Sequence, residues 1–459
     1  MMRHRMLRGF SIFSSFLKIN KEASKIKYDL KVPQRDQTFV DSKISIKNLN
    51  RGCKLIIESP KYPCNASIFV MYSSGSKNEE KDEKGVLQSL KNTYFGIKEP
   101  DLLGNLQLMG SSIAMDFDQE STFFSGTFLP EFTEDYLKTL YSIINNEKTS
   151  NEQAIISERF SQFWQSQNAQ SLDSVYKEVL LQSIFTEPLS SPLSGAREFL
   201  PTIEKINSFS ETHLKNYPSI IIISGIQNPE PFSNIFQSIF TSLLTKPPTS
   251  QPESNFIYQD NSFFCDNDLS FYTISFKGAK LSDPNHQKLE LLQYLYGDSS
   301  NENFFSRAME SKNQSNIAKT LRAFNISYKE TGAFSFNIIS PSKFASKALK
   351  LLVEEILNLE NVNEEEFENA KSRMILDVVR NYQDREKRIE NWAKEMDCTG
   401  KINTLSEVIE GIKNIGLKEI KDELRGLRKS EGNLLYFGKE IEGLPKYEDI
   451  KDMITKEIR

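Results

Sequence analysis

Histidine is scarce in this chain of 459 residues. Only His4, His213 and His286 occur, and none lies between positions 5 and 212. A helix that holds zinc with two imidazoles needs them one helical turn apart. No pair of histidines has this spacing, so a helical two-histidine metal site is excluded.

Long apolar runs, an excess of basic residues and a cysteine framework are also missing. The strongest apolar run covers residues 220–223, whereas spanning a bilayer takes about 18 or more apolar residues. A net charge of −5 gives no electrostatic footprint for nucleic acid. The four cysteines, Cys53, Cys64, Cys265 and Cys398, share no metal-type spacing and are expected to be reduced thiols. What remains is an ordinary globular chain, long enough for two or three domains.

Acidic residues are absent from the first 21 positions, and Glu22 is the first. The segment contains five basic residues: Arg3, Arg5, Arg8, Lys18 and Lys21. Its apolar residues recur every three or four positions on one helical face: Met6, Phe10, Phe13 and Leu17. These features predict a mitochondrial transit peptide at 1–21. A basic segment without a targeting function is the alternative.

Residues 73–95 have the outline of a zinc-binding segment. A predicted strand ends at Gly75-Ser76, a charged loop follows, and Gly85-Val86 opens a short amphipathic helix. This order resembles the metal site of the pitrilysin-type (M16) peptidases, whose helix carries His-x-x-Glu-His. A turn, a charged loop and a short helix also follow one another in many other α/β proteins, which is the competing interpretation.

The chemistry of that motif is missing here. Gln88, Lys91 and Asn92 stand at the positions that correspond to the two histidines and the glutamate. An ammonium group about 5 Å from a divalent ion repels it by roughly 6–7 kcal/mol at an effective dielectric near 20, so Lys91 opposes metal binding. The family's third ligand corresponds to 166–168, which read Ser-Gln-Asn. The resemblance therefore implies no catalytic, metal-binding or cofactor-binding residues and a chain that is not an enzyme.

Two stretches of the chain repeat one pattern of strand, turn, strand and amphipathic helix. Three pairs of residues lie the same distance apart along the sequence: Ile113 and Phe324, Phe117 and Tyr328, Phe123 and Phe334. Helical spacing follows at 132–144 and at 344–357, and apolar strands are predicted at 219–225 and 433–438. The sequence thus predicts a duplicated unit.

A Pro/Ser-rich linker at 245–255 separates the two copies. The predicted fold class is α/β (α+β), with two homologous domains at 38–244 and 256–459, each a mainly antiparallel sheet flanked by helices. A long helical pattern at 364–396 belongs to the second copy. Its regularly spaced apolar residues are interpreted as core contacts: Phe367, Ala370, Met374, Val378, Tyr382 and Trp392.

The duplication, the N-terminal segment and the degenerate motif together resemble the mitochondrial M16 proteins, from about Thr38 onward. These are the processing peptidase subunits and the core proteins of the cytochrome bc1 complex (respiratory complex III). Ser306-Arg307 and the segment from Tyr328 to Phe334 are similar to the α subunit/core protein 2 branch, and 192–195 is similar to a glycine turn of the family. The stretch 297–305, where the α subunit has a glycine-rich loop, contains a single glycine. This departure favours a scaffold over presequence binding, and an ordinary polar loop is the alternative interpretation of this stretch.

The resemblance implies a structural, non-catalytic core subunit of complex III, on the matrix side of the mitochondrial inner membrane and peripheral to it. Implied partners are a β-type processing peptidase/core protein 1 homologue and the cytochrome b, cytochrome c1 and Rieske subunits. A regulatory, substrate-presenting α subunit of the processing peptidase is the alternative. In that role, carboxylates of the 79–83 loop would face a cavity shared with the partner and attract basic presequences. These carboxylates belong to Glu79, Glu80, Asp82 and Glu83. A solvated loop is the simpler interpretation of those carboxylates. An autonomous enzyme is the least favoured hypothesis.

Overall fold

The computed structural model describes residues 42–49, 52–61, 64–93, 104, 106–145, 152–167, 172–195, 200–215, 218–240, 253–297, 317–441, 443 and 445–455. Several predicted features lie outside the described residues. These are the segment 1–21, most of the linker 245–255, most of the loop 297–305, and Ser306-Arg307.

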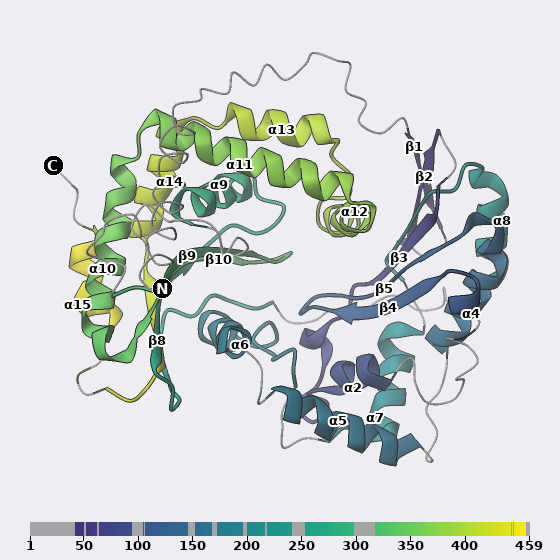
Figure 1. The fold of residues 1–459 in the computed structure, drawn as a ribbon, viewed down its shortest axis with the longest axis horizontal. Helices are drawn as coiled ribbons and strands as arrows, with labels where there is room; N and C mark the ends of the chain where they lie inside the picture. The colour runs from purple at the N-terminus through teal and green to yellow at the C-terminus, as the bar shows by residue number, and fades with distance from the viewer. Residues whose placement is uncertain are drawn as a thin grey trace, which may run out of the picture. The chain divides into compact units, whose positions relative to one another are not determined.

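The first sheet has six strands in the order β1-β2-β6-β3-β5-β4 (Figure 1). Their bounds are β1 (Ser42–Asn48), β2 (Lys54–Pro60), β3 (Ala66–Tyr72), β4 (Ser112–Phe117), β5 (Thr122–Phe128) and β6 (Ile220–Ser224). β2 runs parallel to β6, whereas the pairs β3–β6, β3–β5 and β4–β5 are antiparallel. β3 and β6 are buried along their whole length, as their nearly unbroken apolar sequences predict.

The second sheet repeats this order with five strands, β7-β11-β8-β10-β9. Their bounds are β7 (Asn261–Phe264), β8 (Leu269–Lys277), β9 (Thr320–Ser327), β10 (Gly332–Pro341) and β11 (Gly432–Gly438). The pair β7–β11 is parallel and the other pairs are antiparallel. The predicted fold class, two mainly antiparallel sheets flanked by helices, is confirmed.

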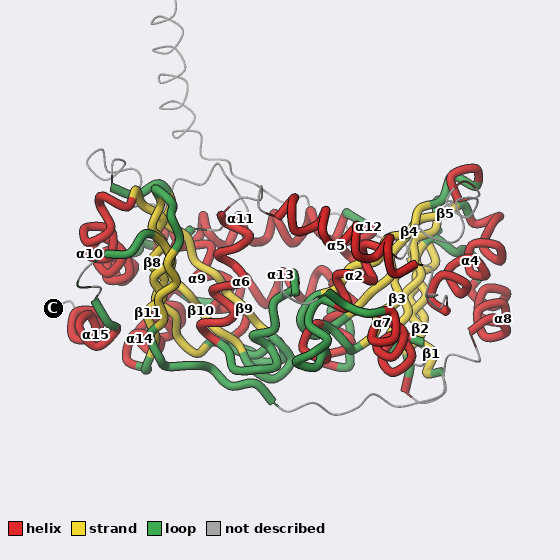
Figure 2. Tube along the Cα trace, turned by 90° about the horizontal axis from the view of Figure 1, so that it is seen from below, coloured by secondary structure: helices red, strands yellow, loops and turns green. Residues whose placement is uncertain are grey.

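Helices pack beside both sheets, as the tube in Figure 2 makes visible. In the first half they are α2 (Val86–Thr93), α4 (Thr133–Asn145), α5 (Gln153–Gln167), α6 (Leu172–Ile184), α7 (Ile203–Phe209) and α8 (Pro229–Phe240). In the second half they are α9 (His286–Tyr296), α10 (Ala345–Asn358), α11 (Glu364–Gln383), α12 (Arg385–Thr399), α13 (Leu405–Asn414), α14 (Leu417–Lys429) and α15 (Tyr447–Thr455). Short 3-10 or π-helical turns include η2 (Ser76–Asn78), η3 (Pro130–Phe132) and η5 (Ser210–Leu214). None of the helices in the described part of the chain has the length and apolarity that crossing a bilayer requires.

The matching hairpins correspond with a one-residue shift from the predicted alignment. Phe117 pairs with Thr122 in the first half, and Ser327 pairs with Gly332 in the second. Ser327, not Tyr328, is therefore the counterpart of Phe117. A shift of one residue moves a side chain to the opposite face of a strand. Because β9 has apolar residues on both faces, its sequence pattern alone did not identify the correct alignment.

The helical pattern predicted at 364–396 is interrupted, because the chain turns at Asp384 between α11 and α12. Asp384 adopts an extended conformation, and its carboxylate accepts hydrogen bonds from the backbone N–H groups of Glu386 and Lys387. An aspartate in this position starts a new helix. The apolar residues predicted to be core contacts do pack in cores: Phe367, Ala370, Met374 and Trp392 are buried, and Val378 and Tyr382 pack against them partly exposed.

Candidate functional site

The loop before α2 is fixed against the turn between β4 and β5. Ser76 N–H donates to the Asp118 carbonyl at 3.0 Å, and Lys77 N–H donates to the Gln119 carbonyl at 3.0 Å. A Cβ atom on Gly75 would come within 2.3 Å of the Asp118 carbonyl oxygen. Only glycine allows so close an approach, which explains the Gly-Ser pair at the end of the strand.

Glu79 caps the N-terminus of α2 instead of facing a cavity. Its side chain is only 5% exposed, and its carboxylate accepts the backbone N–H groups of Gly85 at 3.0 Å and Leu87 at 2.7 Å. Burial raises the pKa of Glu79 to about 7, an effect that these hydrogen bonds and nearby Lys84 oppose. Both interpretations of this residue, a cavity-facing carboxylate and a solvated one, are wrong because capping the buried helix end requires an acceptor there.

The other carboxylates of the loop are more exposed, and two of them have local partners. Asp82 forms an ion pair with Lys205 of α7, and this hydrogen bond lowers the pKa of Asp82. Glu83 accepts a hydrogen bond from the backbone of Glu80 at 3.3 Å. These contacts fit a loop that is held to the surface of its own domain.

The predicted turn at 192–195 packs directly on the start of α2. Gly195 has a φ of +77°, and a Cβ atom on it would lie 2.4 Å from the Cα atom of Gly85. The backbone N–H and hydroxyl of Ser194 donate to the two carboxylate oxygens of Glu178 on α6, at 2.9 and 2.6 Å. Two glycines in contact therefore set the position at which α2 begins.

Gln88 and Asn92 lie one turn apart on α2 and contact each other. The Gln88 Nε2 donates to the Asn92 Oδ1 at 3.0 Å, so their amides share one face of the helix, as the i,i+4 spacing requires. The Nδ2 of Asn92 is buried and has no partner among the described residues. An amide pair of this kind is a poor substitute for the imidazoles with which proteins hold zinc.

Lys91 points to the adjoining edge strand of the sheet. Its Nζ lies 2.7 Å from the Asp116 carboxylate on β4, and 6.0 Å from the centre of the Phe117 ring. Both charged side chains are partly exposed. Lys91 thus carries a positive charge on the helix where the family motif would have an acid.

Arg159, which sequence spacing did not identify, approaches α2 from α5. Its Nη1 donates to the backbone carbonyl of Asn92 at 2.8 Å. Sequence spacing assigns the position of the third metal ligand to 166–168 instead. Ser166 and Gln167 lie in the last turn of α5, and Asn168 lies outside the described residues. The packing of α5 on α2 decides which residue faces the helix, and sequence spacing alone carries no signal for it.

The three motif positions of α2 therefore carry two amides and an ammonium group. Nowhere in the described part of the chain do three or more histidine, cysteine, aspartate or glutamate side chains gather in a way that could hold a metal ion. The four cysteines are free thiols. Burial raises the pKa of Cys53 to about 12, so that thiol is not a reactive nucleophile at neutral pH.

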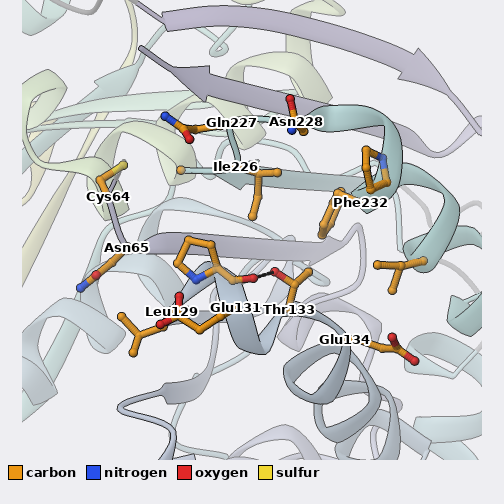
Figure 3. Close-up of a pocket in the computed structure, with 14 residues that line it drawn as sticks. Cys64, Asn65, Leu129, Glu131, Thr133, Glu134, Ile226, Gln227, Asn228 and Phe232 are labelled. Atoms are coloured by element: carbon orange, nitrogen blue, oxygen red, sulfur yellow. Dashed lines mark hydrogen bonds between the residues drawn. The ribbon is translucent and has the colours of Figure 1, made fainter. Parts of the chain in front are cut away.

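A pocket of about 680 Å³ lies away from α2, at the opposite end of the first sheet (Figure 3). Leu129, Ile226 and Phe232 form part of its apolar wall, and the amides of Asn65 and Gln227 lie at its margin. Within the pocket the Thr133 hydroxyl donates to the Pro130 carbonyl at 2.5 Å. Cys64, Glu131 and Glu134 also line it.

Comparisons with known proteins agree with this architecture. Residues 202–374 match the family model described as "Peptidase M16 inactive domain". An uncharacterized zinc protease of Rickettsia felis is 22% identical over 402 residues, which cover 82% of this chain and 93% of that protein. Mitochondrial-processing peptidase subunit alpha of Solanum tuberosum is 20% identical over 441 residues, covering 89% and 84%. Cytochrome b-c1 complex subunit 1 of Saccharomyces cerevisiae is 22% identical over 310 residues, covering 64% and 67%.

Solved structures give the same fold. A chain in the structure described as "Complex III2 from Candida albicans, Inz-5 bound" aligns with a TM-score of 0.72 at 16% identity, covering 90% of this chain and 100% of that chain. Residues 202–374 therefore match a domain model of the M16 peptidases, and the chain is distantly similar to processing peptidase subunits, complex III core subunits and bacterial zinc proteases.

Proposed function

We propose that the protein is a structural, non-catalytic core subunit of mitochondrial complex III, of the core protein 2 type. The observation that carries this proposal is the set of polar residues at α2. Gln88 and Asn92 bond to each other, and two cations, Lys91 and Arg159, lie on or against the helix. A metallopeptidase needs a Lewis acid and a water that it activates, and these side chains supply neither.

The comparisons support the assembly in which we propose this role. The yeast relative is a subunit of the cytochrome b-c1 complex, and the matched Candida albicans chain comes from a complex III structure. The proposed partners are a β-type/core protein 1 homologue and the cytochrome b, cytochrome c1 and Rieske subunits. The proposed place is the matrix side of the inner membrane, reached through a cleaved leader at 1–21. The proposed domains remain 38–244 and 256–459.

Purification of the endogenous protein tests the assembly. Mitochondrial membranes carrying a C-terminally tagged copy are dissolved in a mild detergent, and the tagged chain is captured and analysed by mass spectrometry. We expect cytochrome b, cytochrome c1 and Rieske subunits in near-equal amounts, and an N-terminus beginning after the proposed leader. Recovery of the chain outside every respiratory assembly contradicts the proposal.

A regulatory α subunit of the processing peptidase is the second candidate. It is favoured by the similarity to the Solanum tuberosum subunit, which extends over most of both chains. The buried Glu79 and the paired Asp82 weaken its electrostatic argument. The test is presequence cleavage by the zinc-bearing β-type partner with and without this chain. Stimulation supports the second candidate, and unchanged cleavage rejects it.

A further inference from the structure

Each half of the protein contributes a helix to the sheet of the other half. α12, from the second half, covers an apolar face of the first sheet with a set of side chains that includes Ile389, Trp392 and Met396. Beneath them lie residues of β2, β3 and β6: Ile56, Phe69, Met71, Ile220 and Ile222. Trp392 is only 3% exposed, so this contact excludes water as a domain core does.

The exchange is reciprocal, because α6 of the first half packs on the second sheet. Tyr176 of α6 stacks on Phe271 of β8 with ring centres 4.8 Å apart, and lies 6.2 Å from the ring of Phe437 on β11. Further apolar residues complete this cluster, among them Leu180, Ile184, Phe185 and Leu435. Asn433 of β11 also donates to the carbonyl of Ser183 at 3.0 Å.

An ion pair between the halves accompanies each exchanged helix. On the first sheet, Arg388 of α12 donates to both carboxylate oxygens of Glu58 at 3.1 and 3.0 Å, and both side chains are almost completely buried. On the second sheet, Arg322 of β9 forms an ion pair with Asp173 of α6. The buried Arg388–Glu58 pair tolerates little displacement, because separating it leaves a buried charge without a partner, whereas Asp173 of the second pair is partly exposed.

The hairpin turns of the two sheets are also joined. The backbone N–H of Lys329 donates to Glu120 at 3.0 Å, and its Nζ forms an ion pair with Asp397 of α12. Asp397 accepts a hydrogen bond from Ser73 at 3.1 Å. The interlocked halves therefore share apolar cores and polar contacts at several separate places.

We infer that the two halves fold and unfold as one cooperative unit, although the sequence reads as two repeated domains. Removing either half would leave an apolar face of the other sheet uncovered and would break the ion pair beside it. Two independent domains joined by a linker would each keep their own stability. In this protein the stability of each sheet depends on the other half.

Hydrogen–deuterium exchange of the full chain, at low denaturant concentration, tests this inference. Ile338→Val removes one methyl group from the core of the second half, and Ile221→Val does so in the first half; neither residue belongs to the clusters around α6 or α12. Each change costs about 1 kcal/mol, which corresponds to exchange about fivefold faster through global unfolding. Ile46 on the edge strand β1, which is 51% exposed, gives the matched control Ile46→Val.

We expect either core variant to speed the slowest amides of β3, β6, β8 and β11 by the same factor. The control is expected to change none of them. Faster exchange confined to the half that carries the substitution overturns the inference. Because each core change removes only one methyl group, the variants are expected to fold, and the comparison needs no fragment of the chain.

Discussion

Two polar clusters border the first sheet, and they differ in how far apart in the sequence the segments they connect lie. At α12, the Glu58 carboxylate accepts hydrogen bonds from Arg388 and from Ser224, and it joins elements that lie far apart in the sequence. At α2, the amides of Gln88 and Asn92 bond mainly to each other, and Asn92 Nδ2 has no partner among the described residues. The first cluster links distant segments and stabilises the fold, whereas the second makes local contacts and contributes little to stability.

This difference is what the proposed non-catalytic role predicts. The identity of side chains that position a metal is set by the reaction. In a chain without that reaction, the same positions need only side chains that are compatible with the helix. The partly exposed Lys91–Asp116 pair belongs to the same class, since pairs of this exposure contribute about 0–1 kcal/mol. The comparison of the two clusters therefore ranks the expected effects of substitutions on the free energy of unfolding.

The largest effect is expected at the cluster that joins the halves. Arg388→Ala leaves the Glu58 carboxylate buried without its cation, which costs about 3–5 kcal/mol in the free energy of unfolding. Chemical denaturation, monitored by circular dichroism, measures this loss of stability. The paired change Arg388→Met with Glu58→Gln removes both charges and is expected to cost less. Equal losses in the two variants would contradict a role for the ion pair.

The cap of α2 is expected to make stability depend on pH. Burial raises the pKa of Glu79 from 4.5 to about 7 in the folded protein, so the folded state binds a proton more tightly than the unfolded state. Stability from this group is complete below pH 4.5 and is lost as the pH rises through about 7, by up to about 3 kcal/mol.

Glu79→Gln tests this dependence. Relative to the variant, the original protein is expected to lose stability between pH 4.5 and 8, measured by denaturation at each pH. Exposed Glu80 provides the control Glu80→Gln, which is expected to leave the pH profile unchanged. Parallel profiles for Glu79→Gln and the original protein would show that the buried carboxyl does not titrate in this range.

An intermediate effect is expected at Arg159. Arg159→Ala removes the hydrogen bond to the Asn92 carbonyl at the C-terminal end of α2, where a positive charge is favourable. The expected loss in the free energy of unfolding is about 1 kcal/mol. Arg159→Lys is expected to retain part of this stabilisation. A neutral result for Arg159→Ala would mean that α5 needs no cation to pack on α2.

The smallest effect is expected at the amide pair. Gln88→Ala and Asn92→Ala, singly or together, are expected to change the free energy of unfolding by less than about 0.5 kcal/mol, because alanine favours the helix and each amide mainly loses the other. Denaturation of the double variant measures this. A loss above 2 kcal/mol would place the pair among the residues that the fold requires.

Local periodicity predicted much of the fold from the sequence. The helices after each hairpin and the apolar strands β6 and β11 follow directly from apolar spacing. Two features depended on contacts between distant segments and were missed: the packing of α12 on the first sheet and the approach of Arg159 to α2. The break at Asp384 was also missed, although it is a local N-cap, because apolar spacing continues across it. Glu79 was misread for a related reason, since a carboxylate in a charged loop gives no sign in the sequence that it will be buried.

The zinc content of the full chain tests the central claim most directly. The protein is equilibrated with one equivalent of zinc, passed through a desalting column and analysed by mass spectrometry of the metal, beside the Gln88→Leu/Asn92→Leu variant. We predict the same content, well below one zinc per chain, in both. One zinc per chain in the original protein and its loss in the variant would contradict the account.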